Sequence, residues 1–591
     1  MTFPDPLLFG PPSQEMTTAP RQMSTIGLST ESMIIGLYGV PGAGKSHLLK
    51  QLREQLQHSR FACFEGRDLI EEDTNGGLEA FKTLDSTNQD KKRSEAIEAC
   101  VKQCNESDKT GIVTGHLMFW KEGEAEPKDV WTEADALAYT HLLYLDVPAT
   151  TVFQRQQDDE TRPDRLKCSA KHIENWQSAE KDRLREVCRD QGILFAALKP
   201  QALGKTADFI AAFRERDGTK NLLNAERKLD SIMRTYQTKP TTVLMLDADK
   251  TLAAEDAGDL FWEKAGSELT PLEKVSRQMH YSYPAFVQAM LLYEEFDKDE
   301  YEARCEKAAD KIAFHSQFAD LFGQLDQHPH VAAIVVTSGI AQVWEEVIKR
   351  AGFSSQVKVV GGSRLADQFV VTPVVKGALL KRLQTFHEAY VWAFGDSAVD
   401  LAMLKRADQA IVVVGPEPHR SKSMDTAPQH AIDIDDLQAR QVLLPPSAPP
   451  RLTPRALPLT RLETLHASLF DPLDLIEATA TPAALLLQTP MRDAAASAAA
   501  LRNVHARCGW YLAVHHVARV LGTEPFTIRS VQDTHTEGFR LRHEAQTLII
   551  PLLRGGEPMA LGVAGAFPRA VFLHAREAER SRPGTWRAWR R

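Results

Sequence analysis

The chain has 591 residues, and 70 lysines and arginines against 79 aspartates and glutamates give it a formal net charge of −9. Apolar residues at 43% and charged residues at 25% exclude a wholly disordered chain. No apolar run approaches the ~20 residues that span a bilayer, and the mild acidity argues against a nucleic-acid partner. At about 100–200 residues per domain, this length predicts three or four domains.

Cysteine usage and the N-terminus bear on location. Seven scattered cysteines, an odd number, favour reduced thiols and a cytoplasmic location over a disulfide framework. Residues 1–30 lack the basic and apolar parts of a secretory signal, and their Pro, Ser and Thr content predicts a disordered lead-in. The oligomeric state is left open, a homo-oligomer included.

Short apolar strands alternate with helical periods along most of the chain, which predicts α/β domains with parallel sheets. The second domain contains an insertion of helical pattern at about 253–330. The expected order is a first α/β domain at 31–215, a helical linker at 216–240, a second α/β domain at 241–440, an extended Pro-rich linker at 441–458, a third region at 459–575 and a basic tail at 576–591.

A glycine-rich loop follows the first apolar strand. It reads G-x-x-x-x-G-K-S between a strand and a leucine-periodic helix, and its key residues are Gly39, Gly42, Gly44, Lys45 and Ser46. Glycines let backbone N–H groups surround an anion. Lys45 is expected to reach the β- and γ-phosphates, and the Ser46 hydroxyl to bind Mg²⁺. The loop therefore predicts binding of ATP or GTP with Mg²⁺.

Over about residues 33–200 this domain resembles small-molecule kinases of the adenylate-kinase and gluconate-kinase type. The resemblance rests on the strand HLLYLDVP at 141–148 and the arginines Arg155, Arg162 and Arg165. It implies a lid whose arginines neutralise the transferring phosphoryl group. The strand GIVTG at 111–115 departs from the pattern, because it ends without a carboxylate that could help to bind Mg²⁺. Kinase activity and nucleotide binding without turnover both stay open.

A second chemical motif begins at the strand VLML, which delivers Asp247 and Asp249. Side chains i and i+2 of a strand point the same way, so one carboxylate can attack phosphorus while the other exchanges a proton with the leaving oxygen. Further candidates follow in order downstream: Thr337 after the strand AAIVV, Lys376 at the start of a helix, and Asp396 and Asp400 in VWAFGDSAVD.

These motifs resemble the haloacid-dehalogenase (HAD) superfamily over about residues 241–420, and are most similar to phosphoserine phosphatase. The resemblance implies that Asp247 forms an aspartyl-phosphate and that Asp249 is the general acid and base. Thr337 and Lys376 would hold the phosphoryl oxygens. Mg²⁺ would be bound by Asp247, the Asp249 carbonyl and Asp396, with Asp400 in support.

The helical insertion stands where this superfamily has a cap over the site. Asp256 stands roughly where phosphoserine phosphatase has a carboxylate for the substrate amine. No cap arginine for a substrate carboxylate is found, so the substrate is expected only to be a small phosphorylated metabolite.

The third region resembles uracil phosphoribosyltransferase over about 120 residues, on LQTPMRD at 487–493 and the segment 548–575. The family's loop for phosphoribosyl pyrophosphate is matched by Arg554, Gly555, Gly556 and Glu557. The family's acidic pair with Thr/Ser-Gly-Gly-Ser is not found after residue 575. We therefore expect an incomplete domain without phosphoribosyl transfer of its own. The basic tail is either an anion- or RNA-binding arm or an extension from a shifted reading frame.

Together the motifs predict a multidomain α/β protein with a P-loop NTPase fold, a HAD-like Rossmannoid fold with a helical cap, and a partial phosphoribosyltransferase-like domain. The leading function is Mg²⁺-dependent phosphomonoester hydrolysis beside an ATP-binding kinase-like domain, in nucleotide or pyrimidine salvage by analogy. A polynucleotide kinase–phosphatase is one alternative, although the cap and the acidic charge oppose it. A non-catalytic nucleotide-binding regulator or scaffold is the other.

Overall fold

The computed structural model describes residues 32–159, 168–200, 204–215, 217–264, 266, 268–417, 420, 424, 427–435, 437–470, 481–552 and 555–574. The predicted lead-in at 1–30 and basic tail at 576–591 lie outside these residues. The chain divides into two compact units, Met1–Asp471 and Pro472–Arg591. Within the described residues, no helix is both long and apolar enough to cross a bilayer. Both units mix helices with strands, which confirms the predicted α/β class.

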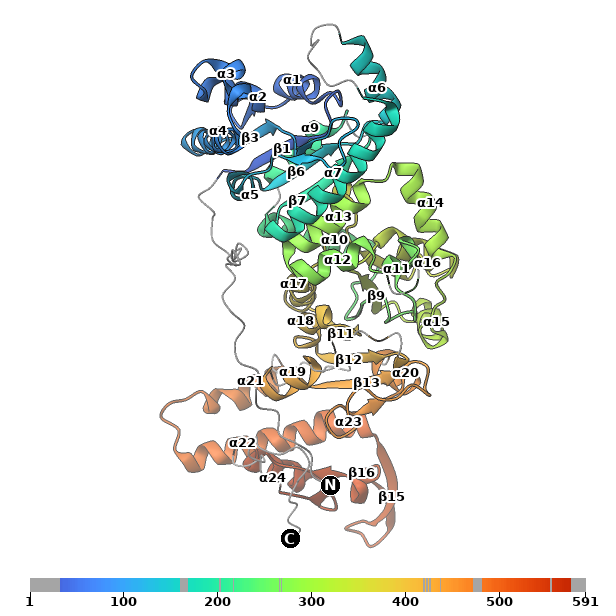
Figure 1. The fold of residues 1–591 in the computed structure, drawn as a ribbon. Coiled ribbons are helices and arrows are strands. Elements are labelled where there is room, and N and C mark those ends of the chain that lie inside the picture. Colours follow the sequence, from blue (N-terminus) through green and yellow to red (C-terminus); the bar gives the residue numbers. More distant parts are fainter. Residues whose placement is uncertain are drawn as a thin grey trace, which may run out of the picture. The chain divides into compact units, whose positions relative to one another are not determined.

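The first sheet of the N-terminal unit is parallel, with strand order β2-β3-β1-β6-β7 (Figure 1). Its strands are apolar and almost wholly buried, as expected for a parallel sheet covered on both faces. The strands are β1 (Ile34–Tyr38), β2 (Phe61–Phe64), β3 (Thr110–Thr114), β6 (His141–Leu145) and β7 (Leu194–Leu198). The helices are α1 (Lys45–Gln55), α2 (Gly66–Asp73), α3 (Gly77–Thr83), α4 (Ser86–Ser107), α5 (Glu133–Ala138), α6 (Ala149–Asp158), α7 (Ala170–Gln191) and α9 (Thr206–Glu215), and β4 (Met118–Phe119) pairs with β5 (Lys128–Asp129).

The second sheet of this unit is parallel too, with order β10-β9-β8-β11-β12-β13-β14. Most of the predicted catalytic residues follow its central strands, so they lie at the carboxyl edge of the sheet. The strands are β8 (Thr242–Leu246), β9 (Val331–Val336), β10 (Val357–Val360), β11 (Tyr390–Gly395), β12 (Gln409–Val414), β13 (Ala439–Leu443) and β14 (Leu459–Thr460). The helices around it are α10 (Gly218–Met233), α15 (Ser316–Gly323), α16 (Ala341–Arg350), α17 (Pro373–Thr385), α18 (Leu401–Leu404), α19 (Ala427–Asp435) and α20 (Leu462–Phe470), with single turns η1 (Leu325–Gln327), η2 (Leu365–Asp367) and η3 (Ala398–Asp400).

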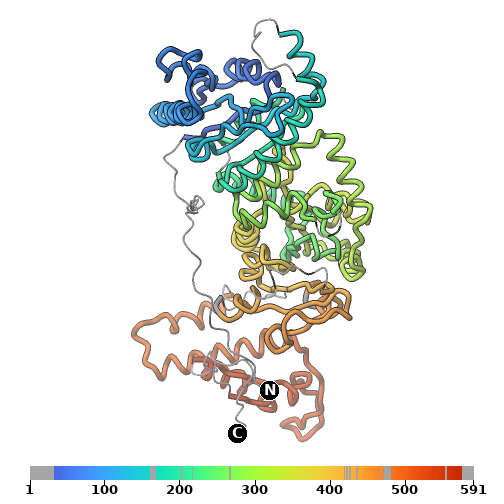
Figure 2. Tube along the Cα trace, in the orientation of Figure 1, coloured from blue at the N-terminus to red at the C-terminus, as the bar shows by residue number. Residues whose placement is uncertain are grey.

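Inserted helices leave this second sheet after β8 and return before β9. They are α11 (Ala257–Phe261), α12 (Pro271–Met279), α13 (Tyr283–Glu294) and α14 (Lys298–Ala309), drawn in green in Figure 2. The predicted insertion at 253–330 also includes α15, whose Phe318 and Phe322 are buried with Phe394 of β11 in the core of the second sheet. We refer to α11–α14 as the cap helices.

Cap helix α13 closes the open edge of the first sheet. The Gln288 side chain accepts a hydrogen bond from the Phe195 N–H of β7 and donates one to the Phe195 carbonyl, both at 2.8 Å. Glu295 accepts from the Ala197 N–H at 3.3 Å and pairs with Arg185 of α7 at 2.7 Å. Because an unpaired strand edge exposes backbone donors and acceptors, these side chains replace the missing neighbouring strand and bind the cap to the first domain.

The two segments predicted as linkers are both packed into the N-terminal unit, and the first is helical as predicted. The segment 216–240 contains α10, whose Ala225 and Leu229 lie in the core beside the second sheet. The segment 441–458 is not extended, because the buried Gln441 side chain donates to the Leu452 and Leu457 carbonyls, both at 2.7 Å, and folds the chain back to β14. Burial of Leu457 in the core favours this folded path over the extended chain that the prolines indicate. The first unit therefore extends to residue 471 rather than 440, and residues 459–470 belong to it.

The C-terminal unit is built from helices and two short sheets. Helices α22 and α24 pack with their backbones in contact, since a Cβ on Gly509 would lie 1.9 Å from the Met559 carbonyl oxygen, and one on Gly562 would lie 1.8 Å from that of Ala506. Most of the exposed large apolar side chains of the described residues belong to this unit. Its elements are α21 (Pro482–Gln488), η6 (Thr489–Met491), α22 (Ala498–Leu512), the π-turn η7 (Ala513–Val517), α23 (Ala518–Leu521), the hairpin β15 (Thr523–Arg529) and β16 (His535–Leu541), η8 (Glu544–Gln546), α24 (Glu557–Ala566), and the parallel pair β17 (Leu548–Ile549) and β18 (Val571–Phe572).

Candidate active sites

Asp247, Asp396 and Asp400 gather at the carboxyl edge of the second sheet. Asp247 follows β8 and Asp396 follows the neighbouring β11, while Asp400 ends the turn η3. One carboxylate oxygen of each lies within 4.8 Å of the others, and all three side chains are buried. Burial, and then the charge of Asp400, raises the pKa of Asp247. Burial, and then Asp247, likewise raises that of Asp396. A buried set of hard oxygen donors fits Mg²⁺.

Lys376 of α17 places one positive charge inside this cluster. Its ammonium donates to Asp247 and, at 2.7 Å, to Asp400. Burial opposes the charge on Lys376, but the two carboxylates outweigh it and raise the pKa of the ammonium. The helix starts where it does because Thr372 caps it, accepting from the Val375 N–H at 3.2 Å, and Pro373 occupies its first turn. The Lys376 side chain thus joins Asp247, 129 residues away in the sequence, to Asp400, 24 residues away.

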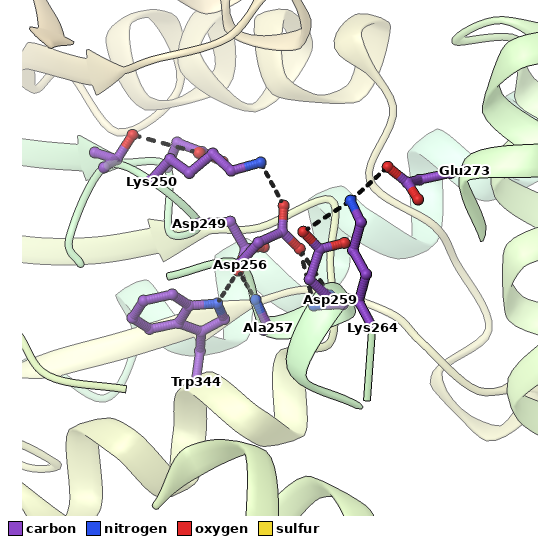
Figure 3. A network of polar contacts seen from close by, with 11 residues as sticks. Asp249, Lys250, Asp256, Ala257, Asp259, Lys264, Glu273 and Trp344 are labelled. Carbon is purple, nitrogen blue, oxygen red and sulfur yellow. Dashed lines mark hydrogen bonds and ion pairs between the residues drawn. The ribbon is translucent and has the colours of Figure 1, made fainter. Parts of the chain in front are cut away.

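Asp249 lies beside the cluster in a different environment. Its Oδ1 accepts hydrogen bonds from the Ala257 N–H at 2.7 Å and the Trp344 indole at 3.1 Å (Figure 3). Burial, and then the charge of Asp256, raises the pKa of Asp249 to about 8. A Cβ on Gly339 would lie 2.5 Å from Asp249 Oδ2, so a larger residue there would displace the Asp249 carboxylate. The neighbouring Thr337 is buried, and its Oγ1 accepts from the Gly339 N–H at 3.0 Å.

The loop after Asp249 carries an ion pair. Lys250 Nζ lies 2.8 Å from Asp256 Oδ2 (Figure 3). Asp256 Oδ1 accepts from the N–H groups of Gly258 and Asp259, at 3.0 and 3.2 Å. Asp256 is therefore already paired with a lysine of this chain and caps α11, rather than standing open for a substrate amine.

The glycine-rich loop has the conformation that its sequence predicts. Gly39, Gly42 and Gly44 have backbone φ values of 143°, 97° and 103°, which residues other than glycine rarely adopt. The Lys45 ammonium donates to the carbonyl of Gly39 and lies 3.4 Å from His116 Nδ1.

Arg155 of α6 lies against the same loop, donating to the Ala43 carbonyl at 2.9 Å. Ser46 is the second residue of α1. Arg162 and Arg165 lie outside the described residues.

Three protein-family models match the chain. An AAA-domain model matches residues 38–174, a haloacid dehalogenase-like hydrolase model matches 244–405, and a uracil phosphoribosyltransferase model matches 478–585. The chain thus carries a kinase-like P-loop domain, a HAD hydrolase domain and a uracil-phosphoribosyltransferase-like domain. No curated protein matches the chain in sequence.

Solved structures match parts of the chain. A sugar kinase from Janibacter sp. is 16% identical, with 30% of this chain and 92% of that chain covered, at a TM-score of 0.20. Thymidylate kinase from Candida albicans is 10% identical, with coverages of 31% and 92%, at 0.21. L-2-haloacid dehalogenase from Xanthobacter autotrophicus is 15% identical, with coverages of 29% and 77%, at 0.21.

The loop predicted for phosphoribosyl pyrophosphate precedes α24 of the transferase-like domain. Gly555 and Gly556 lead into the helix and Glu557 opens it, while Arg554 lies outside the described residues. The Glu557 carboxylate pairs with His574 Nε2 at 3.2 Å. Glu557 is therefore engaged with His574, which follows β18.

Sequence reasoning missed Glu180 in the kinase-like domain. This glutamate of α7 is fully buried, and it accepts hydrogen bonds from the Leu117 N–H and the Tyr144 hydroxyl, both at 3.2 Å. Burial raises its pKa to about 7, against the opposing charge of Lys45. The signal was present, because Glu180 lies on the apolar face of α7 with Ile173 and Leu184.

Proposed function

We propose that the HAD hydrolase domain is a Mg²⁺-dependent phosphatase of small phosphomonoesters, acting through an aspartyl-phosphate on Asp247. The observation that carries this is the ammonium of Lys376, which joins Asp247 to Asp400 inside a buried cluster of carboxylates. A carboxylate that attacks a phosphoryl group adds negative charge to an anionic site, so the site needs compensating charge. Lys376 supplies one such charge.

In the proposed reaction, an Asp247 oxygen forms a bond to phosphorus while the bond from phosphorus to the ester oxygen breaks. Asp249 gives its proton to the leaving oxygen, and an alcohol departs. A water oxygen then forms a bond to phosphorus while the bond from phosphorus to the Asp247 oxygen breaks, Asp249 takes a proton from the water, and inorganic phosphate leaves the regenerated Asp247 carboxylate. The raised pKa of Asp249, about 8, supports a proton on this side chain at neutral pH.

Other residues of this domain would hold the reacting groups. Lys376 and Thr337 would hold the phosphoryl oxygens. Asp247, Asp396 and the Asp249 carbonyl would bind Mg²⁺, with Asp400 in support, and the bound ion would offset the charge of the phosphoryl group. The cap helices would limit the site to small substrates and exclude water.

For the kinase-like domain we propose that ATP binds with its phosphates on the loop of Gly39, Gly42 and Gly44, and that a phosphoryl group passes to a small acceptor. Lys45 would move from the Gly39 carbonyl to the β- and γ-phosphates, and Ser46 would bind Mg²⁺. Arg155, with Arg162 and Arg165, would neutralise the transferring group. Nucleotide or pyrimidine salvage is the proposed setting, on the combination of domains.

The test of the phosphatase is phosphate release from a panel of phosphomonoesters with Mg²⁺, by wild type and by Asp247→Asn. The substitution should abolish release, while Asp299→Asn, an exposed carboxylate on cap helix α14, serves as the matched control. Full activity of Asp247→Asn would overturn the assignment. EDTA should stop the wild-type reaction, and Mg²⁺ should restore it.

The kinase-like domain is tested separately by the binding and consumption of ATP in wild type and in Lys45→Ala. Loss of both in the variant supports the proposal. Tight binding by wild type without consumption, in the presence of a broad acceptor panel, would favour the nucleotide-binding regulator instead.

A further inference from the structure

Lys250 occupies a backbone conformation that glycine would adopt more easily. Its φ of 58° lies in the left-handed region. Asp249 and Thr251 flank it in the sequence of the proposed catalytic loop. A long side chain at such a position is uncommon. Residues held in this way gather at functional sites, so an observed case motivates a functional hypothesis.

The ammonium of Lys250 is fixed in place by the cap side of the site. It lies 2.8 Å from Asp256 Oδ2, and Asp256 is itself held by the N–H groups of Gly258 and Asp259 (Figure 3). The side chains of Lys250 and Asp256 keep 29% and 28% of their surface exposed, so the pair is open to a ligand. The charge of Lys250 also opposes the rise in the pKa of Asp396, which places it near the metal-binding cluster.

An ammonium has three N–H donors. Within the described residues, the Lys250 ammonium donates to one partner, Asp256. The remaining donors can bind an anionic group, and a charge-assisted hydrogen bond of this kind is stronger than a neutral one.

The position of Lys250 relates it to the leaving group. Asp249, the proposed donor of a proton to the leaving oxygen, directly precedes Lys250, and Asp256, the partner of its ammonium, caps cap helix α11. A leaving group that accepts the Asp249 proton would therefore depart beside the loop that carries the Lys250 ammonium.

We propose that Lys250 selects phosphomonoesters whose leaving group carries a second anionic group, a carboxylate or a phosphate, near the ester oxygen. This rests on the proposed phosphatase function of the same site. Lys250 is a specificity-determining residue in this view, and the unfavourable backbone conformation is retained because glycine at this position would lack the ammonium.

The test compares substrates that differ mainly in that group. The ratio of kcat/KM for 3-phosphoglycerate to that for glycerol 3-phosphate is measured on the full chain with Mg²⁺. Fructose 1,6-bisphosphate against fructose 6-phosphate forms a second arm, which distinguishes a carboxylate from a phosphate. Wild type should favour the anionic member of at least one pair. Lys250→Gly and Lys250→Gln should each lower that ratio about tenfold or more, as expected for one lost charge-assisted hydrogen bond.

The two variants separate charge from backbone. Lys250→Gly removes the ammonium and relaxes the backbone, so its melting temperature should equal or exceed that of wild type. Lys250→Gln removes the ammonium but keeps the left-handed conformation. Gln368→Gly is the matched control, because Gln368 is an exposed residue with φ of 66° outside the site, and it should keep the wild-type ratio.

An unchanged substrate ratio in both Lys250 variants would overturn the proposal, and so would a wild-type enzyme without preference in either pair. Hydrolysis of p-nitrophenyl phosphate by wild type, lost in Asp247→Asn, shows that the phosphatase assignment holds in that event. Without that hydrolysis and without turnover of any of the four substrates, the phosphatase function itself is overturned.

Discussion

The two candidate phosphate sites of the N-terminal unit balance their charges by different means. In the HAD hydrolase domain, side chains supply the charge: the carboxylates of Asp247, Asp396 and Asp400 surround the buried ammonium of Lys376. In the kinase-like domain, the backbone of a glycine loop forms the site, and Lys45 donates to the carbonyl of Gly39. Loss of one side chain should therefore disturb the folded structure at the first site, and mainly ligand binding at the second.

Lys376→Met tests the first half of this comparison and has the largest expected effect. The substitution leaves buried carboxylates without their cation, which should lower the free energy of unfolding by about 3–5 kcal/mol. Phosphate release should fall by about 10³-fold. Chemical denaturation and a phosphate-release assay measure the two effects. Lys381→Met, an exposed position on the same helix α17, should change stability by about 0.5 kcal/mol at most. Equal stability of the two variants would contradict the buried-charge argument.

Lys45→Ala tests the second half. The affinity for ATP should fall about 10- to 100-fold, because hydrogen bonds from one ammonium to the phosphates are lost. Titration with a fluorescent ATP analogue measures this, with Lys50→Ala on the exposed face of α1 as the control. Phosphate release by the HAD hydrolase domain should persist in Lys45→Ala. Its loss would mean that the two sites are not independent.

Gln288→Leu tests how firmly the cap helices are bound to the first sheet. The substitution removes both partners of the buried Phe195 backbone and should lower the free energy of unfolding by about 1–3 kcal/mol. Hydrogen exchange at the Phe195 amide should become faster. Gln278→Leu is the control, because the Gln278 side-chain amide makes only an exposed hydrogen bond to Asp190, at 2.9 Å. Unchanged exchange in Gln288→Leu would show that apolar packing alone holds this interface.

The sequence patterns for the two candidate phosphate sites are local. The glycine loop, Lys45 and Ser46 are consecutive, and Asp247 and Asp249 end one apolar strand, so short patterns define them. The neighbourhood of Asp247, Lys376 and Asp400 was expected across long separations because these motifs, in this order, resemble the HAD superfamily.

Features that depend on distant partners could not be predicted in the same way. Prolines at 441–458 suggested an extended linker. In the structure Leu457 is buried in the core, and the Gln441 side chain donates hydrogen bonds to carbonyls of the returning chain. The ion pair of Lys250 with Asp256 joins residues only six apart, but it depends on the left-handed backbone of Lys250, which the residue types do not indicate. Closure of the first sheet by Gln288 is likewise a contact between domains.

Glu180→Gln gives the smallest expected effect, and its sign depends on pH. The pKa of Glu180 is raised to about 7, so between about pH 4.3 and about pH 7 the folded chain keeps a proton that the unfolded chain has released. Wild-type stability should therefore decrease as the pH rises through this window, whereas glutamine does not titrate.

The melting temperature of Glu180→Gln relative to wild type should rise between about pH 5 and about pH 8, by a few degrees for an effect on the order of 1 kcal/mol. Glu174→Gln, an exposed position on the same helix, should show no such trend. A constant difference between Glu180→Gln and wild type would mean that Lys45 keeps Glu180 ionised throughout, and the kinase-like domain would then contain a permanent buried ion pair like that of the HAD hydrolase domain.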